Sequence, residues 1–239
     1  MIKLFLLLLS GAKFGKLLTT GGTMLISVVV YAFIFGWGYA VGFVFLMFVH
    51  EMGHYVAARY RGLDVGAPTF IPFLGAWIAM KEMPRDAEVE AFVGLGGPLI
   101  GTAGALACYF LARYIDSPLL LAVSYSGFFL NLFNLIPISP FDGGRITAVL
   151  SPRIWLLGVP VLILLFIYRP SPMLLLIALM ASPNVWKAIK YRADSEEGQT
   201  YYRVSTRSKW EYGFYYIALT AFLAIMTHEV HEMLKHVVK

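Results

Sequence analysis

The sequence predicts an all-α polytopic membrane protein with about six to seven transmembrane helices. Two features of its composition predict this class: 59% of the 239 residues are hydrophobic and only 14% are charged. A soluble domain is typically about half apolar and about a quarter charged. The distribution of the apolar residues predicts the same class, because they form runs whose length is close to the roughly 20 residues that cross a hydrocarbon core of about 30 Å. The composition therefore excludes an ordinary soluble domain.

Seven apolar runs are candidates for membrane spans. They cover residues 19–36, 38–58, 92–114, 118–136, 152–168, 171–186 and 213–234. Before them, residues 1–10 resemble a signal-peptide core, but residues 11–16 lack a convincing small-residue cleavage site, which predicts a retained interfacial segment over residues 1–18. The fifth and sixth runs are short, Pro160 interrupts one of them, and only Arg169 and Pro170 separate them. A helical hairpin that does not fully cross is therefore an alternative to two spans.

The basic residues predict the orientation of these spans. With a cytoplasmic N-terminus and seven crossings, 15 of the 19 Lys and Arg residues face the cytoplasm, and only Arg113, Arg169, Lys235 and Lys239 do not. This asymmetry satisfies the positive-inside rule. The net charge of +5 is dispersed between apolar runs and forms no basic stripe, so no nucleic-acid partner is expected. The single Cys108 excludes an intrachain disulfide.

A short polar motif stands near the end of the second run. His50-Glu51-Met52-Gly53-His54 has the spacing H-E-x-x-H within a helical stretch. Residues i and i+4 share one helix face, so both imidazoles can reach one metal while Glu51 lies beside a water molecule as a general base. Polar residues that merely line a helix interface are the structural alternative. Ionisable groups inside a membrane cost several kcal/mol unless they are compensated, which favours the metal site.

A zinc site that catalyses a reaction usually has three protein ligands, so a third is expected elsewhere. His228, His231 and His236 lie at the C-terminus, on the predicted opposite side of the membrane, where a solvated helix end is expected. Asp142 follows two prolines and precedes a glycine pair in the segment Asn134 to Arg145, a pattern that predicts a broken helix. An aspartate in an ordinary turn is the alternative. The predicted topology brings Asp142 and the motif to the same membrane half.

These two motifs together resemble the site-2 protease family of intramembrane zinc metalloproteases. H-E-x-x-H is followed by N-x-x-P-x-x-P-x-D-G-G, and the resemblance runs from about Thr19 to Leu150, including an expected Gly96-Gly97-Pro98 turn. The resemblance implies one Zn²⁺ per chain, held by His50, His54 and Asp142, with Glu51 as the catalytic base. It implies that Asn134 orients substrate or stabilises an oxyanion, although an amide there could also cap the broken helix.

Residues 62–90 contain prolines and glycines among apolar and aromatic residues, which predicts a short re-entrant or β-hairpin segment. The resemblance implies that this segment receives substrate, and an exposed strand edge could hold an unwound peptide. A structural hairpin that faces lipid is the alternative.

One membrane-embedded domain is therefore predicted over residues 1–239, with a catalytic core at 19–150 and additional helices at 151–239. The resemblance implies an endopeptidase that cleaves membrane-protein or transmembrane-peptide substrates within the bilayer. It also implies a bacterial plasma membrane, and the predicted topology places the active site toward the cytoplasm. A catalytically silent, metal-containing binding or chaperone protein is the alternative. A metal transporter is disfavoured because no inverted repeat is evident. No oligomeric state is predicted.

Overall fold

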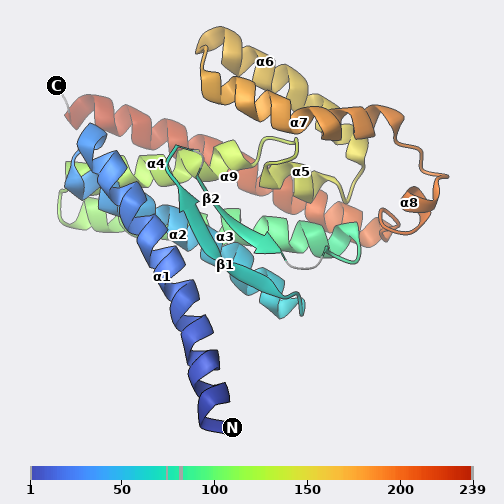
Figure 1. Ribbon diagram of the computed structural model, residues 1–239. Coiled ribbons are helices and arrows are strands. Elements are labelled where there is room, and N and C mark those ends of the chain that lie inside the picture. Colours follow the sequence, from blue (N-terminus) through green and yellow to red (C-terminus); the bar gives the residue numbers. More distant parts are fainter. Residues whose placement is uncertain (1, 74, 81–82, 238–239) are drawn as a thin grey trace.

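The computed structural model describes residues 2–73, 75–80 and 83–237 (Figure 1). Lys81 and Lys239, which enter the predicted charge asymmetry, lie outside the described residues. Helices dominate the described chain, with one short antiparallel hairpin. The elements are α1 Ile2–Phe35, α2 Trp37–Tyr60, β1 Val65–Ile71, β2 Gly75–Met80, α3 Ala87–Tyr114, α4 Pro118–Asn134, α5 Asp142–Thr147, η1 Pro152–Leu157, α6 Gly158–Tyr168, α7 Pro172–Lys190, α8 Glu196–Gln199 and α9 Thr206–Val237.

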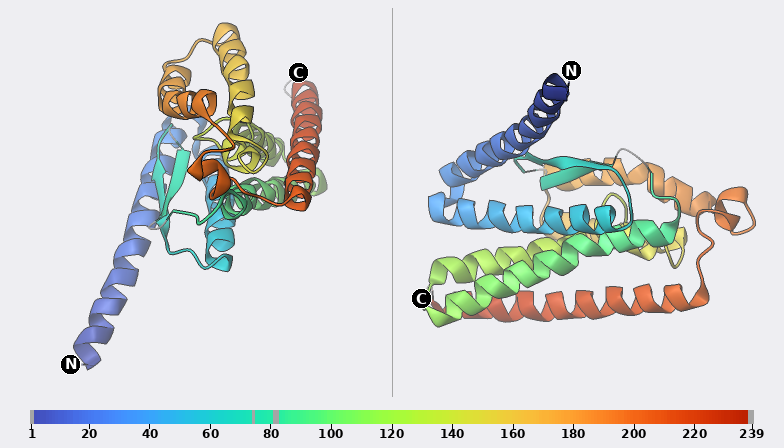
Figure 2. Two further views of the ribbon diagram at one scale, coloured as in Figure 1. Left: turned by 90° about the vertical axis from the view of Figure 1, so that its right-hand side faces the viewer. Right: turned by 90° about the horizontal axis from the view of Figure 1, so that it is seen from below.

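Every predicted apolar run is helical. Four helices of the described chain, α2, α3, α7 and α9, are long and apolar enough to cross a membrane, and three apolar helical stretches are shorter. Those stretches are Thr19–Phe35, Pro118–Asn134 and Pro152–Tyr168. A helix of about 17 residues rises about 25 Å, near the lower limit for a span. The fifth run is a 3₁₀ turn, η1, followed by α6, and α6 lies beside α7 (Figures 1 and 2).

The predicted division between an N-terminal segment and the first span is not an element boundary. Helix α1 is continuous from Ile2 to Phe35. Gly11 and Gly15 lie within it, and each costs only about 1 kcal/mol of helix propensity relative to alanine, whereas a proline would break it. The N-terminal half of α1 projects away from the rest of the molecule (Figure 1).

Helices α2, α3 and α4 pack closely because glycines line their contacts. A β-carbon at Gly53 of α2 would lie 2.2 Å from the Gly96 carbonyl oxygen of α3, and one at Gly101 would lie 2.3 Å from Asn131 Oδ1 of α4. Such close approach is typical of small-residue interfaces between membrane helices. The expected turn at Gly96-Gly97-Pro98 is therefore wrong. These residues lie inside α3, where the glycines provide space for α2 rather than a change of direction.

The segment between α2 and α3 forms the hairpin β1–β2, one of the two predicted forms. The strands are antiparallel, with Pro68 opposite Ile78 and Phe70 opposite Ala76. Helix α1 runs beside the hairpin (Figures 1 and 2) and bonds to the outer edge of β1. There Thr20 Oγ1 donates to the Pro68 carbonyl at 2.7 Å, and the Phe70 N–H donates to Thr23 Oγ1 at 3.2 Å.

The expected helix break follows α4, which ends at Asn134, and α5 begins at Asp142. Irregular backbone at membrane depth requires partners from the protein or from water. Helix α9 supplies one, because Tyr216 Oη donates to the Leu135 carbonyl at 2.7 Å. The 3₁₀ turn η1 contacts the helix that follows the break, because Trp155 Nε1 donates to the Gly144 carbonyl of α5 at 2.8 Å. Elements after residue 151 thus support both the break and the helix that carries Asp142.

Candidate metal centre

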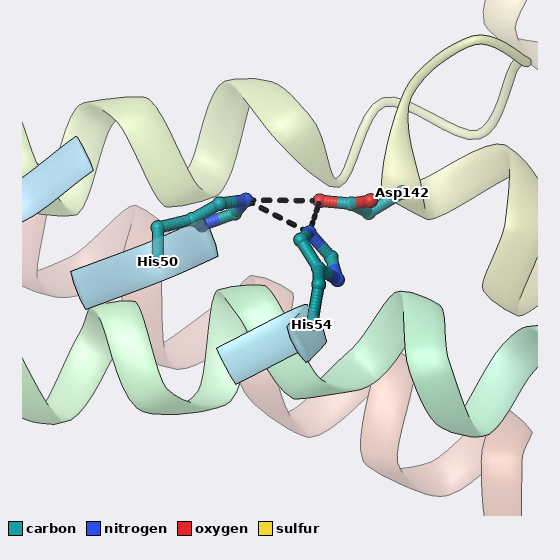
Figure 3. A group of neighbouring side chains, drawn as sticks. All are labelled: His50, His54 and Asp142. Carbon is teal, nitrogen blue, oxygen red and sulfur yellow. Dashed lines mark hydrogen bonds and ion pairs between the residues drawn. The ribbon is translucent and has the colours of Figure 1, made fainter. Parts of the chain in front are cut away.

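Three predicted ligand residues meet in one buried cluster (Figure 3). His50 and His54 project from one face of α2, and Asp142 projects from the first turn of α5. His50 Nε2 lies 3.2 Å from Asp142 Oδ2, His54 Nε2 lies 3.1 Å from the same oxygen, and the two nitrogens lie 3.1 Å apart. Two segments 88 residues apart in the chain therefore place three donor atoms at the corners of a small triangle.

The far side of each imidazole is held by a hydrogen-bond acceptor. His50 Nδ1 lies 2.8 Å from Asn131 Oδ1 of α4, and His54 Nδ1 lies 2.8 Å from the Val93 carbonyl oxygen of α3. The Asn131 Nδ2 group donates to the Gly127 carbonyl at 2.7 Å, which assigns its oxygen to His50. Both Nδ1 atoms therefore carry protons, so both Nε2 lone pairs point toward Asp142.

This donor set fits a bound divalent cation. Two neutral imidazole lone pairs and a carboxylate oxygen have no proton to share at about 3 Å, so a cation compensates their mutual repulsion. Tetrahedral zinc holds nitrogen and oxygen ligands at about 2.0–2.2 Å, which separates the ligand atoms by about 3.3–3.5 Å. The observed triangle is close to that spacing. Among the described residues no other group of three His, Cys, Asp or Glu side chains has such a geometry.

Space for these imidazoles depends on one glycine of α3. A β-carbon at Gly97 would lie 2.2 Å from His54 Nε2. Even the smallest side chain at this position would displace the ring from the cluster. The glycine pair read in the sequence as a turn is thus a packing requirement of the metal centre.

Glu51 lies beside the cluster and faces a cavity of about 620 Å³. Its side chain is buried, with a residue exposure of 7%, and no described residue forms a hydrogen bond or an ion pair with its carboxylate. The nearby Arg145 guanidinium acts on this carboxylate electrostatically and offsets part of the cost of burying its charge. The arrangement provides a proton acceptor next to three candidate ligands.

The cavity joins the cluster to the hairpin and to α7. Its wall is largely apolar, which limits access of bulk water and strengthens electrostatic interactions inside. Residues of the motif, the hairpin and α7 share the wall, among them Glu51, Phe73, Ala76, Asn134 and Met180.

Asn134 and Asn131 have different surroundings. Asn134 lines the cavity, and its Nδ2 group donates to the Leu130 carbonyl one turn earlier at 3.1 Å, a side-chain bond within its own helix. Asn131, which the sequence interpretation missed, is 1% exposed and contacts His50 directly. The sequence feature that could have indicated Asn131 is its amide side chain in an apolar helix, three residues before Asn134, because a buried polar group there requires a hydrogen-bond partner.

The C-terminal histidines do not join the cluster. His231 of α9 stacks on Tyr125 of α4 with ring centroids 5.4 Å apart, and the described part of the chain brings neither His228 nor His236 to the metal centre.

Comparison with known proteins indicates the family to which a chain with this site belongs. The model of Peptidase family M50 matches residues 38–117, which include His50, Glu51 and His54. A zinc metalloprotease of Methanocaldococcus jannaschii is 34% identical over 111 residues, covering 44% of this chain and 32% of that protein. A second protein of that organism, named as a candidate zinc metalloprotease, is 31% identical over 144 residues, covering 51% of this chain and 72% of that protein.

A solved site-2 protease from M. jannaschii has 21% sequence identity and a TM-score of 0.46 with this chain, covering 76% of this chain and 87% of that chain. The chain spans about a third of the length of the first zinc metalloprotease and most of the length of the second protein. The second protein carries the assignment, because the match is above 30% identity and extends over most of its length. This chain therefore belongs to peptidase family M50, the site-2 protease family of membrane-embedded metalloproteases.

Proposed function

We propose that this protein is an intramembrane zinc endopeptidase that hydrolyses peptide bonds in or near transmembrane segments of membrane proteins. The observation that carries the proposal is the buried Glu51 carboxylate beside three convergent ligand residues, on a helix long and apolar enough to span a membrane. The family assignment and the names of the relatives support the same chemistry.

His50, His54 and Asp142 would hold the zinc ion through Nε2, Nε2 and Oδ2. A bound zinc ion would polarise the scissile carbonyl and make a water molecule acidic enough to lose a proton near neutral pH. Asn131 and the Val93 carbonyl fix the orientation of the two imidazoles, since each accepts a hydrogen bond from an Nδ1–H group.

Glu51 is the proposed general base and acid. Its carboxylate accepts the proton of the attacking water and then delivers it to the departing amide nitrogen. Asn134 has a second Nδ2 proton beyond the one given to Leu130, and on the cavity wall this proton can be donated to the substrate carbonyl oxygen.

The hairpin is the proposed substrate holder, and β2 offers the free edge. Thr20 and Thr23 of α1 bond to Pro68 and Phe70, so the polar backbone groups of these two residues point away from β2. In an antiparallel ladder, the backbone N–H and C=O groups of two directly opposed residues either all face the partner strand or all face away from it. Ala76 and Ile78, their partners, therefore direct backbone N–H and C=O groups outward from β2.

An unwound peptide can add to this edge of β2 as a third strand, and Ala76 lies on the wall of the cavity that contains Glu51. The outer edge of β1 is occupied by the threonines of α1. Strand addition would hold the peptide extended, which peptide-bond hydrolysis requires because a helical backbone buries its carbonyls in internal hydrogen bonds.

The proposed setting is a bacterial plasma membrane with the metal centre toward the cytoplasm. His50 lies nine residues before Arg59 on α2, about 13 Å along the helix axis from this basic end. The excess of basic residues on that side supports the orientation.

The direct test is cleavage of a panel of membrane peptides by the purified protein and by Glu51→Gln, with zinc content measured on both. We expect Glu51→Gln to retain zinc and to lose activity by about 10²–10⁴-fold, the usual contribution of general acid–base catalysis. A variant that retains zinc and full cleavage would show that Glu51 is not the base. Zinc-loaded wild type that cleaves no membrane peptide would favour the silent binding protein instead.

A further inference from the structure

The second oxygen of the Asp142 carboxylate lies at the start of a series of charged side chains that contact one another. Oδ2 faces the two imidazoles, whereas Oδ1 lies 3.9 Å from Arg145 Nη1, one turn further along α5. Arg145 Nε in turn lies 3.7 Å from Glu90 Oε1, in the first turn of α3. The guanidinium thus stands between two carboxylates, one of which is a candidate metal ligand.

This series of interacting side chains ends at Tyr201, in the linker between α8 and α9. Tyr201 Oη donates a hydrogen bond of 2.7 Å to Glu90 Oε2, and the Ala87 N–H donates to the Tyr201 carbonyl at 3.0 Å. Burial and the neighbouring Glu90 carboxylate raise the pKa of Tyr201, so its hydroxyl remains a donor. The linker is therefore attached to the start of α3 by both backbone and side chain.

We propose that Arg145 and Glu90 are positioning residues for Asp142, and that Tyr201 holds them in place, so that docking of the α8–α9 linker sets how tightly the metal centre binds zinc. This inference rests on the proposed function, because it assumes that the His50–His54–Asp142 cluster binds zinc.

The first argument is geometric. A carboxylate that offers one oxygen to a metal must keep the other oxygen from rotating into its place, and a cation on that second oxygen fixes the rotamer. Arg145 is only 20% exposed, and its Cβ would lie 3.1 Å from a β-carbon at Gly94. The glycine at position 94 therefore allows α5 to approach α3 closely enough for Arg145 to reach Glu90.

The second argument is electrostatic. With zinc bound, the positive charges of the ion and Arg145 would balance the carboxylates of Asp142, Glu51 and Glu90, so the charges of these groups would sum to zero. Without Arg145 the same group would carry a net negative charge in surroundings that solvate charge poorly. Without Glu90 the guanidinium would lose the carboxylate that draws it toward α3.

The third argument is the position of the linker. Tyr202, next to Tyr201, packs in an apolar cluster that includes residues of α7 and residues that flank α5. Lys187 Nζ lies 5.6 Å from the centroid of the Tyr202 ring. Lys187 also pairs with Glu197 Oε1 at 2.5 Å. A partner or ligand that displaced this linker would remove Tyr201 from Glu90 and loosen Asp142 without touching the cavity.

The test measures zinc dissociation constants by chelator competition for the full-length protein in detergent. We expect Arg145→Gln and Glu90→Gln to weaken zinc binding by about 10–100-fold, the usual effect of losing a partner of a metal ligand. Arg145→Lys should recover part of the loss. Tyr201→Phe should weaken binding several-fold, whereas the matched control Tyr202→Phe, which leaves the Glu90 hydrogen bond intact, should not.

A merely structural role is separated by two further measurements. Thermal unfolding should show that the zinc-free variants still fold cooperatively, and cobalt-substituted Arg145→Gln should show altered visible absorption bands. In the double variant Arg145→Gln/Tyr201→Phe, the tyrosine change should add nothing.

Wild-type zinc dissociation constants in Arg145→Gln and Glu90→Gln would overturn the proposal, even if the wild type binds zinc and cleaves peptides. Should Arg145→Gln fail to fold, Glu90→Gln and Tyr201→Phe give the same decision. Wild type without zinc or cleavage would instead overturn the proposed function itself.

Discussion

At the scale of single residues, the metal centre depends on side chains that lie outside the H-E-x-x-H motif. The motif places two imidazoles on one face of α2, but a histidine ligand also needs a partner for its other nitrogen. Asn131 and the Val93 carbonyl supply these partners from two other helices. The centre is therefore assembled from α2, α3, α4 and α5.

Replacing Asn131 should weaken zinc binding more than it weakens the fold. In Asn131→Ala the His50 Nδ1–H loses its acceptor, so the ring can rotate or adopt the other tautomer. We expect a rise of about 10–100-fold in the zinc dissociation constant. Chelator competition measures it, and Asn134→Ala serves as the matched control because Asn134 contacts neither imidazole. Equal affinity in wild type and Asn131→Ala would refute the assigned role.

The ligand residues could be predicted from the sequence because short local patterns of residues indicate them. H-E-x-x-H requires only helical periodicity, and Pro137, Pro140 and the glycine pair mark the break before Asp142. Asn131, Arg145 and Glu90 could not be assigned in the same way, because their roles depend on which helices pack together. Gly96 and Gly97 were misread as a turn, since glycine signals both tight turns and close helix contacts.

At the scale of elements, α1 and the hairpin form one unit. Sequence patterns predicted an apolar helix and a re-entrant or hairpin segment separately. Their contact follows from Thr20 and Thr23, which occupy the polar edge of β1. This pairing could not be read from the sequence, because threonine is common in membrane helices and its hydroxyl usually bonds within its own helix.

Substituting Ala76 tests the free edge of β2. Proline at this position removes an outward N–H group and leaves the β1–β2 ladder intact, as edge strands tolerate. We expect Ala76→Pro to lower kcat/KM by about tenfold, the equivalent of one hydrogen bond of about 1.4 kcal/mol, with zinc content unchanged.

The matched control for this edge is Ala76→Ser, which keeps the N–H group and a small side chain. Cleavage by Ala76→Pro at the wild-type rate would show that substrate does not add to β2. A loss of zinc or of thermal stability in Ala76→Pro would show that the hairpin itself had been disturbed.

At the scale of the whole molecule, the later helices support the segment that carries Asp142. Tyr216 of α9 bonds to the Leu135 carbonyl in the break, Trp155 of η1 bonds to the Gly144 carbonyl of α5, and α7 forms part of the cavity wall. The described residues 151–237, whose use the sequence left open, therefore belong to the same packed body as the metal centre.

The predicted orientation can be measured with single cysteines in a Cys108→Ser background. Tyr114→Cys lies at the end of α3, and Gln199→Cys lies at the end of α8. The positive-inside distribution predicts that an impermeant maleimide labels Tyr114→Cys in intact cells and Gln199→Cys only after permeabilisation. The reverse pattern would place the metal centre toward the other side.

The central claim is that α2 and α5 together hold one zinc ion, and X-ray absorption at the zinc edge tests it most directly. The wild type should bind one zinc per chain with scattering from two imidazoles and from oxygen ligands at about 2.0–2.2 Å. Asp142→Ala should lose most of this zinc, as should His54→Ala. Zinc bound without imidazole scattering, or bound equally by Asp142→Ala, would contradict the account.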